Sequence, residues 1–243
     1  SLLRWSEFRK GSPQIPFEVI SKEPSSLQAA ELIRNQSRSG RTLKRIGDVI
    51  FSLLIIILGS PIFLLLAILV RSSSPGSIFY IQQRVGRNYK KFGCIKFRTM
   101  YKDADTILPN LLEKYPLMKK EYEKDFKLRN DPRITRLGRF LRRSSLDELP
   151  QFFNVLKGEM SVVGPRPVVE NEIKKYSLFM DEVISVRPGL TGLWQVSGRN
   201  NLSYKKRIEL DLIYARNRNF KLDLEIILLT FGVLLFPMDR GAF

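Results

Sequence analysis

The stretch VIFSLLIIILGSPIFLLLAILV, from Val49 to Val70, contains no charged side chain. An α-helix rises about 1.5 Å per residue, so this run is long enough to cross the ~30 Å hydrocarbon core of a bilayer. It is also apolar all round, which argues against the core helix of a soluble protein. The stretch therefore predicts a membrane-embedded helix.

Ser60 and Pro61 interrupt the centre of this run. Proline removes a helix hydrogen bond and kinks the helix, and the Ser60 hydroxyl can bond a backbone carbonyl that the kink sets free. Both flanks are basic, and basic flanks stay on the cytoplasmic side. We therefore expect a re-entrant helix that bends at Ser60-Pro61 and leaves by the face it entered. The alternative is an ordinary kinked helix that spans the membrane. The flanking cations are Arg38, Arg41, Lys44 and Arg45 before the run, and Arg71, Arg84, Arg87, Lys90 and Lys91 after it.

The 243-residue chain has 41 Lys and Arg against 24 Asp and Glu, a formal net charge of +17 and a pI of about 10.1. This surplus indicates an anionic partner: nucleic acid, anionic lipid or a phosphorylated substrate. Histidine is absent from the sequence, which excludes His-based acid–base catalysis, Ser-His-Asp and Cys-His nucleophiles, and His-ligated zinc. The single cysteine, Cys94, excludes an internal disulfide and a cysteine-cluster metal site, and we expect it to be a buried apolar residue.

The patterning predicts three parts. Residues 1–40 are a polar N-terminal arm or linker, residues 41–71 are the re-entrant membrane helix, and residues 72–243 are a helix-rich α+β domain on the cytoplasmic side. The expected elements are a short helix near 26–36, strands at 77–84 and 92–100 joined as a hairpin around residues 86–88, a charged helical region at 103–127 interrupted by prolines, and helices at 134–143, 203–216 and 223–236.

Two adjacent carboxylates, Asp147 and Glu148, follow the basic pair Arg142-Arg143. Carboxylates among cations suit phosphoryl transfer, because cations hold the anionic substrate, a metal ion screens the phosphates and a carboxylate can attack phosphorus. The alternative is a solvated, charged start of a helix.

The local signals place this pair near a helix N-terminus. Ser145 and Glu148 fit a capping box, although Pro150 strains that register and the helix could restart there instead. In either case Asp147 lies near the positive end of a helix, which favours its ionised form. Gly158 is a plausible end for the helix.

Several cations are candidates for phosphate binding. Lys96 and Arg98 alternate along a predicted strand and so lie on one face, although such a pair alone is more often a solvated strand face. Arg166 is held between two prolines, which lowers the entropy cost of presenting it to an anion. Arg199 lies in a small polar loop. The sequence has neither a Walker A loop nor a GxGxxG motif.

Taken together, these segments resemble the bacterial sugar transferase family, the monotopic phosphoglycosyl transferases that act on polyprenol phosphate. The resemblance extends from about Lys44 to the C-terminus, and residues 123–128 and 240–243 favour the branch of undecaprenyl-phosphate galactose phosphotransferases. The similar blocks are Lys44-Arg45 with Asp48, Ser60-Pro61, residues 96–100, 130–135, 145–151 and 153–158, Gly164-Pro165-Arg166-Pro167, and residues 187–192 and 195–200.

The resemblance implies transfer of a hexose-1-phosphate, galactose being the expected sugar, from a UDP-sugar to undecaprenyl phosphate with Mg²⁺ as cofactor and UMP as product. It implies a covalent phosphosugar on Asp147, with Glu148 holding Mg²⁺ or assisting the lipid phosphate. This would be the first membrane step in the synthesis of an O-antigen, capsule or exopolysaccharide, at the cytoplasmic face of the bacterial inner membrane. The residues expected to contact phosphates are Lys96, Arg142, Arg166 and Arg199.

Anionic membrane lipids are expected as further partners, and a homodimer is left open. Nucleic acid is not expected, because the sequence lacks a basic-aromatic binding motif. Glucose or an N-acetylated amino sugar is the alternative to galactose. A non-enzymatic, membrane-anchored assembly protein is the alternative outside enzymes; it would explain the anchor and the charge, but not the Asp147-Glu148 pair or the Gly164–Pro167 block.

Overall fold

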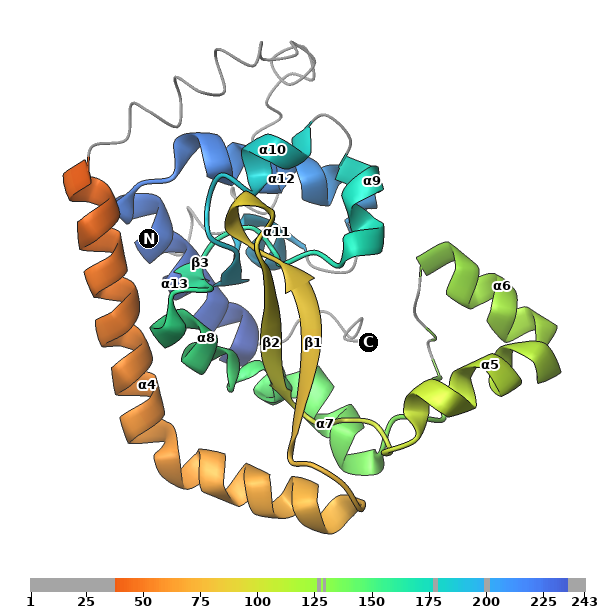
Figure 1. The fold of residues 1–243 in the computed structure, drawn as a ribbon. Coiled ribbons are helices and arrows are strands. Elements are labelled where there is room, and N and C mark those ends of the chain that lie inside the picture. The colour runs from red at the N-terminus through yellow and green to blue at the C-terminus, as the bar shows by residue number, and fades with distance from the viewer. Residues whose placement is uncertain (1–37, 126–127, 129, 177–178, 199–201, 236–243) are drawn as a thin grey trace.

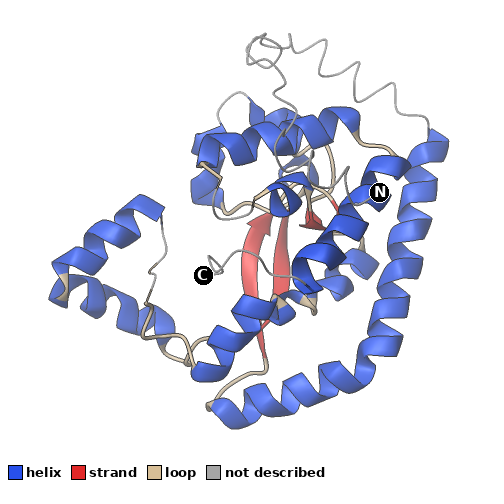
Figure 2. Ribbon diagram, turned by 180° about the vertical axis from the view of Figure 1, so that it is seen from behind, coloured by secondary structure: helices blue, strands red, loops and turns tan. Residues whose placement is uncertain are grey.

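The computed structural model describes residues 38–235 except 126–127, 129, 177–178 and 199–201. The described part is a helix-rich α+β fold, as expected, with two small two-stranded sheets. Figure 2 shows the strands in the middle of the molecule with helices around them. The arm predicted at 1–40 lies almost entirely outside the described residues, as does its short helix near 26–36.

One long apolar helix, α4 (Arg38–Ser73), runs along the outside of the molecule and bends near its middle (Figure 1). Pro61 lies inside this helix and has no N–H to donate to the carbonyl of Ile57. The Ser60 hydroxyl donates to that same carbonyl at 2.9 Å. The predicted bend, and the role of Ser60 in satisfying a freed carbonyl, are therefore confirmed, although α4 continues through Ser60 and Pro61 without a break.

The two faces of α4 differ. The inner face packs on the domain: Phe51 lies 6.2 Å from Phe152 between ring centroids, and Leu66 and Val70 are buried. The outer face exposes a continuous set of large aliphatic side chains. Within the described residues, α4 is the one helix long and apolar enough to cross a membrane, and its two faces are compatible with a monotopic membrane anchor. The exposed side chains are Leu43, Ile46, Ile50, Leu53, Leu54, Ile57, Leu58, Ile62, Leu64, Leu65, Ile68 and Leu69.

The basic start of α4 fastens the helix to the domain. Arg45 donates to the carbonyls of Val155 and Leu156, at 2.6 and 2.9 Å. The buried Asp48 accepts from the Ser161 hydroxyl at 2.8 Å and from the Val162 amide at 3.1 Å. These bonds fix the position of α4 relative to the rest of the fold.

The predicted hairpin is present as β1 (Phe79–Val85) and β2 (Lys91–Phe97), which pair antiparallel with Tyr80 opposite Lys96. Its turn contains the short 3₁₀ helix η1 (Arg87–Tyr89), in which Asn88 has φ +54°. Cys94 is buried and free, as expected.

The charged region forms α5 (Ala104–Lys114) and α6 (Pro116–Asp125), a pair that projects from the body (Figure 1). The predicted interruption is confirmed at Pro116, where α6 begins, but was wrong at Pro109, which lies inside α5. The basic helix α7 (Arg136–Ser144) follows, and the Thr135 side chain caps it by accepting from the Gly138 amide.

The segment that bears the two carboxylates differs from the prediction. Ser145 caps no helix N-terminus: it ends α7 with φ +57°, its side chain makes no capping bond, and the single 3₁₀ turn η2 (Leu146–Glu148) follows. The regular helix α8 (Gln151–Lys157) starts after Pro150, whose missing N–H costs nothing at that position. The capping box was therefore wrong and the restart at Pro150 was right. Gly158 ends α8 in the left-handed region, as predicted.

Beyond α8, β3 (Ser161–Val163) pairs parallel with β4 (Gly189–Thr191), so residues 187–189 lead directly into a strand. A Cβ on Gly164 would approach the Arg187 carbonyl oxygen to 2.5 Å, so the two loops require glycine at this contact. The connecting elements are η3 (Glu170–Glu172), α9 (Ile173–Tyr176), α10 (Met180–Val183) and α11 (Leu193–Ser197).

Two further helices, α12 (Tyr204–Asn217) and α13 (Phe220–Leu235), agree with the predicted positions within a few residues. Ser203 caps α12 as expected, by accepting from the Lys206 amide. Asp223 of α13 accepts from Lys44 at 2.7 Å and from the Tyr214 hydroxyl at 2.7 Å, which joins α13 to α4 and α12.

Candidate active site

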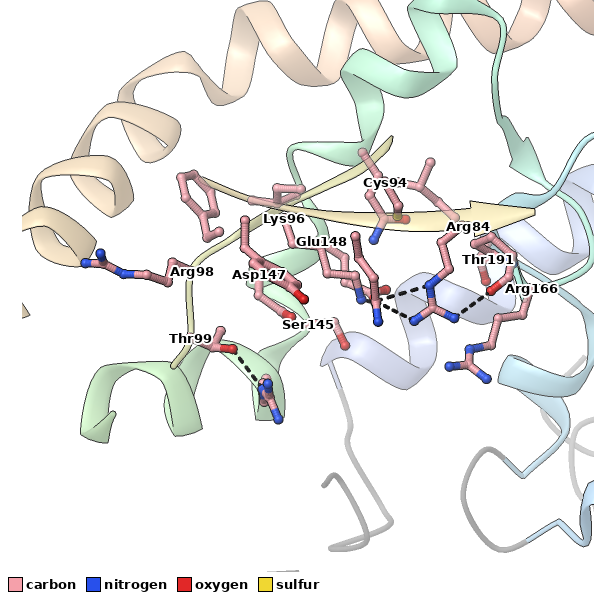
Figure 3. Close-up of a pocket in the computed structure, with 18 of the residues that line it drawn as sticks. Arg84, Cys94, Lys96, Arg98, Thr99, Ser145, Asp147, Glu148, Arg166 and Thr191 are labelled. Atoms are coloured by element: carbon pink, nitrogen blue, oxygen red, sulfur yellow. Dashed lines mark hydrogen bonds and ion pairs between the residues drawn. The ribbon is translucent and has the colours of Figure 1, made fainter. Parts of the chain in front are cut away.

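A cleft of about 840 Å³ is lined by the β1–β2 hairpin, by η2 and by the loop that contains Arg166. Asp147, Glu148, Lys96 and Arg84 face this cleft, with Arg166 beside them (Figure 3). A second part of its lining is apolar and includes Phe51 of α4. The cleft therefore connects a charged centre with the long apolar helix α4.

The 3₁₀ turn η2 orients the two carboxylates differently. In a 3₁₀ helix, successive side chains are about 120° apart, so adjacent residues face different surroundings. Asp147 is 7% exposed, whereas the Glu148 side chain is 37% exposed and reaches β2. The left-handed Ser145, which ends α7, sets where this turn begins.

Glu148 forms an ion pair with Lys96, with 2.6 Å between Oε1 and Nζ. Burial works against the charged form of Glu148, but Lys96, Arg166 and Arg84 outweigh it and lower the pKa of Glu148. Glu148 is therefore ionised at neutral pH.

Asp147 shows the opposite behaviour. Burial, followed by the negative charge of Glu148, raises the pKa of Asp147 to about 6, against the opposing effects of Lys96 and Arg142. The prediction that a nearby helix end favours its ionised form was wrong in sign, because α8 starts four residues later, at Gln151, and desolvation dominates. At pH 7 Asp147 is mostly ionised but poorly solvated, a condition that favours nucleophilic attack.

Two more of the predicted phosphate-binding cations, Arg142 and Arg166, line the same cleft as Asp147 and Glu148. They come from segments of the chain other than η2 and β2. The Arg166 side chain is 28% exposed and lies 3.5 Å from the Glu172 carboxylate. Arg142, at the end of α7, donates through Nε to the Thr99 hydroxyl at 2.9 Å, which orients its guanidinium. The structure thus brings Lys96, Arg142 and Arg166 to one cleft with the carboxylates of Asp147 and Glu148. Arg199 lies outside the described residues.

Arg98 does not share the position of Lys96. Strand β2 ends at Phe97, so alternation stops, and Arg98 turns back to donate to the carbonyls of Val70, Ser74 and Pro75. It caps the C-terminal end of α4, whose last carbonyls would otherwise have no helical partner.

Sequence reasoning missed Arg84 as a site residue. It is buried on β1, donates to the Pro167 carbonyl at 3.0 Å and to Gln82, and lines the cleft. Burial and the neighbouring Arg166 lower the pKa of Arg84. The hairpin register, which sets Gln82 opposite Cys94 and Tyr80 opposite Lys96, could have revealed that Arg84 shares a face with Lys96.

The family model and the similar proteins all concern sugar transfer or polysaccharide production. The sequence model of the family described as "Bacterial sugar transferase" matches residues 39–237. The chain is 48% identical over 198 residues to "Undecaprenyl-phosphate galactose phosphotransferase" of Salmonella typhimurium, covering 82% of this chain and 41% of that protein. It is 44% identical over 204 residues to "Exopolysaccharide production protein ExoY" of Sinorhizobium fredii, covering 84% and 89%.

The name of a third relative specifies a different sugar, glucose. The chain is 43% identical over 195 residues to "UDP-glucose:undecaprenyl-phosphate glucose-1-phosphate transferase" of Klebsiella pneumoniae, covering 77% of this chain and 39% of that protein. The chain spans about two fifths of the length of several of the curated relatives it matches.

Proposed function

The chain belongs to the bacterial sugar transferase family, and we propose that it transfers a hexose-1-phosphate from a UDP-sugar to undecaprenyl phosphate and releases UMP. Relatives named for undecaprenyl phosphate and for exopolysaccharide production support this reaction as a membrane step of polysaccharide synthesis. The observation that carries the proposal is the buried Asp147 beside the ion-paired Glu148, in a cleft lined by cations and reaching the membrane helix.

In this mechanism a carboxylate oxygen of Asp147 attacks the phosphorus that bears the sugar. A phosphorus–oxygen bond forms, the bond to the bridging oxygen of the diphosphate breaks, and UMP leaves with that oxygen and its electron pair. A phosphate oxygen of undecaprenyl phosphate then attacks the same phosphorus and displaces Asp147 as a carboxylate. No proton has to move, which suits a protein without histidine.

The surrounding residues have distinct tasks. Lys96, Arg142, Arg166 and Arg199 hold phosphate oxygens by charge-assisted hydrogen bonds. Glu148 uses Oε1 for Lys96, so its other oxygen can serve as a Mg²⁺ ligand.

The donor set fits Mg²⁺ as the cofactor. The described residues contain no group of three or more acidic, Cys or His side chains that could hold a metal by themselves. Mg²⁺ binds through one or two carboxylates together with substrate phosphates and water, so Glu148 beside the substrate is sufficient. When bound, the ion supplies charge stabilisation at the diphosphate.

Galactose is the proposed sugar, on the names of relatives such as "UDP-galactose-lipid carrier transferase" from Erwinia amylovora, 47% identical over 197 residues. A glucose-1-phosphate transferase at 43% identity keeps glucose as the second candidate. An N-acetylated amino sugar remains the third.

Release of UMP from a panel of UDP-sugars, with undecaprenyl phosphate and Mg²⁺, tests the activity and the sugar together. The highest kcat/KM is expected with UDP-galactose. Asp147→Asn is expected to abolish both turnover and the covalent phosphosugar while UDP-sugar binding persists. Absence of UMP release with every donor would favour the non-enzymatic assembly protein, and near-normal turnover of Asp147→Asn would exclude Asp147 as nucleophile.

We further propose that residues 41–71 enter and leave the membrane on the cytoplasmic face, so that residues 72–243 work there as the catalytic domain on the inner membrane. The bend at Ser60-Pro61 and the basic residues on both flanks support this topology. Single cysteines placed near Arg41 and near Ser73 are expected to be protected in intact cells from a thiol reagent that does not cross the membrane. The native Cys94 is buried and gives little background. Labelling of one flank and not the other would show a true crossing.

A further inference from the structure

Glu172 of η3 is an acid that contacts two arginines of the cleft. Its Oε2 lies 3.8 Å from Nη1 of Arg84, and its Oε1 lies 3.5 Å from Nη1 of Arg166. Both arginines line the cleft, and Figure 3 shows them on the same side of Glu148. Glu172 is not among the residues that line the cleft, so it acts on a substrate there only through these two cations.

The local chain fixes the position of the Glu172 carboxylate. Its Oε2 accepts from the Val169 amide at 3.1 Å, and the side chain is 14% exposed. Val169 lies directly before η3, on the segment that follows Arg166. A bond to the main chain restricts the rotamers of a long side chain, which is otherwise free to move. The carboxylate is therefore a fixed point that can orient the more flexible guanidiniums.

Arg84 has donors left for a ligand. A guanidinium carries five N–H groups. Arg84 gives two of them to Gln82, at 3.1 and 2.6 Å, and one to the Pro167 carbonyl at 3.0 Å. Its remaining N–H groups, on Nη1 and Nη2, make no hydrogen bond within the part of the chain that the structure describes. A buried cation with unused donors at a cleft suits an anionic ligand.

The charges of the three groups explain why an acid lies between the arginines. Two adjacent guanidiniums repel each other, and burial followed by the charge of Arg166 lowers the pKa of Arg84, whereas Glu172 acts in the opposite direction. One carboxylate between two guanidiniums leaves the group with a net positive charge. Glu172 therefore offsets the repulsion that separates Arg84 from Arg166 and still leaves an attraction for an anion.

We propose that Arg84 and Arg166, the arginine pair, together bind the diphosphate of the nucleotide-sugar, and that Glu172 is the positioning residue that holds the pair side by side. The planar fork of arginine matches the oxygens of a phosphate. A diphosphate offers oxygens on two neighbouring phosphorus atoms, so it can engage both forks at once. The inference rests on the proposed function in one respect, namely that the substrate is a UDP-sugar.

Titration calorimetry of the full chain with UDP and with UMP, at constant Mg²⁺, tests this assignment. Glu172→Asp keeps the charge but shortens the side chain, so the carboxylate no longer reaches both arginines. We expect the Kd for UDP to rise about tenfold or more, the effect of losing one charge-assisted contact, and the Kd for UMP to rise less, since UMP has a single phosphate. Glu170→Asp is the matched control: it makes the same change at an exposed acid of η3 that pairs with Lys91, and should leave both Kd values unchanged.

Two further variants test the arginine pair directly. Arg84→Lys keeps the charge but removes the planar fork, so it should also raise the Kd for UDP, and it provides the test if Glu172→Asp fails to fold. In the Arg166→Ala protein, Glu172→Asp should raise the Kd for UDP by a smaller factor than in the parent, because one of the two cations that Glu172 orients is already gone. A general structural effect of Glu172→Asp would multiply with that of Arg166→Ala instead.

The outcomes separate the two proposals. Absence of both UDP binding and UMP release would overturn the proposed function and the diphosphate site with it. If the parent protein releases UMP from a UDP-sugar, any one of four results would overturn the arginine pair and leave the proposed function intact. These results are an unchanged Kd for UDP in Glu172→Asp or in Arg84→Lys, an equal loss in Glu170→Asp, equal losses for UDP and UMP, and effects of Glu172→Asp and Arg166→Ala that multiply. Equal losses for UDP and UMP would show that a single phosphate, such as that of a lipid phosphate, occupies the pair.

Discussion

Replacing Asp147 by Asn is expected to stabilise the folded protein above pH 6 while it removes the nucleophile. Asp147 is 7% exposed, and its folded pKa of about 6 lies above its ordinary value of 3.8. The folded state therefore holds this proton more tightly than the unfolded state does. The resulting stability is fully present below pH 3.8 and is lost as the pH rises through 6.

The size of the effect follows from the pKa difference. A shift of about two units, at ~1.4 kcal/mol per unit, makes ionised Asp147 cost about 3 kcal/mol of unfolding free energy. Asn has nearly the same shape and does not ionise. The stability of Asp147→Asn relative to the parent should thus increase by about 2.4 kcal/mol between pH 4 and pH 8, or by about 5–10 °C in Tm for a chain of this size.

Thermal unfolding in one detergent, from pH 4 to pH 8, measures this difference. Glu148→Gln is the matched control, because the pKa of Glu148 is lowered by Lys96, Arg166 and Arg84 despite its burial. Its carboxylate stabilises the fold above its ordinary pKa, so Glu148→Gln should lose stability as the pH rises. If the profile of Asp147→Asn runs parallel to that of the parent, or falls below it at pH 8, then Asp147 is not destabilised by burial and the account of its reactivity is wrong.

Four other outcomes are expected. The kcat/KM for UMP release should fall on the acid side with a midpoint near pH 6, the pKa of Asp147, and a profile that is flat from pH 5 to pH 8 would contradict this. Glu148→Gln should lower activity sharply and recover part of it with added Mg²⁺; retention of both rate and metal dependence would exclude Glu148 as a metal ligand. Each charge-assisted contact is worth about 1.5–3 kcal/mol, so Ala at any predicted phosphate-binding cation should reduce kcat/KM about tenfold or more, and four near-neutral variants would refute the site. Ser60→Ala with Pro61→Leu should restore a continuous spanning helix and expose one flank to the thiol reagent, whereas unchanged protection would show that the break does not set the topology. The four phosphate-binding cations to be replaced by Ala are Lys96, Arg142, Arg166 and Arg199.

Local patterns determined much of the fold. The apolar run identified α4. The missing N–H of Pro61 and the neighbouring Ser60 hydroxyl predicted its bend and a bond from Ser60 to a freed carbonyl, which in the structure is that of Ile57. Alternating strands and turn residues located the hairpin, and the Gly158 and Ser203 ends of helices were correct because such caps depend on the local chain. The order of the short blocks was enough to predict the family.

The properties of the site were decided by tertiary contacts instead. Local sequence suggested a capping Ser145 and a helix end that stabilises the charged form of Asp147. Instead Ser145 ends α7, and burial raises the pKa of Asp147 and makes it the weaker acid of the pair. Alternation predicted that Arg98 shares a face with Lys96, but β2 ends at Phe97, and the Arg98 guanidinium caps the C-terminal end of α4 instead.

Arg84 shows the same limit from the other side. It lies in no block that the resemblance drew on, and it belongs to the site because the fold brings it to the same cleft as Arg166, which is distant in sequence. Capping, turns and apolar periodicity depend on neighbours within a few residues, so the sequence determines them. Desolvation and ion pairing depend on which segments the fold brings together, so only the tertiary structure decides which of the two carboxyl groups is the weaker acid.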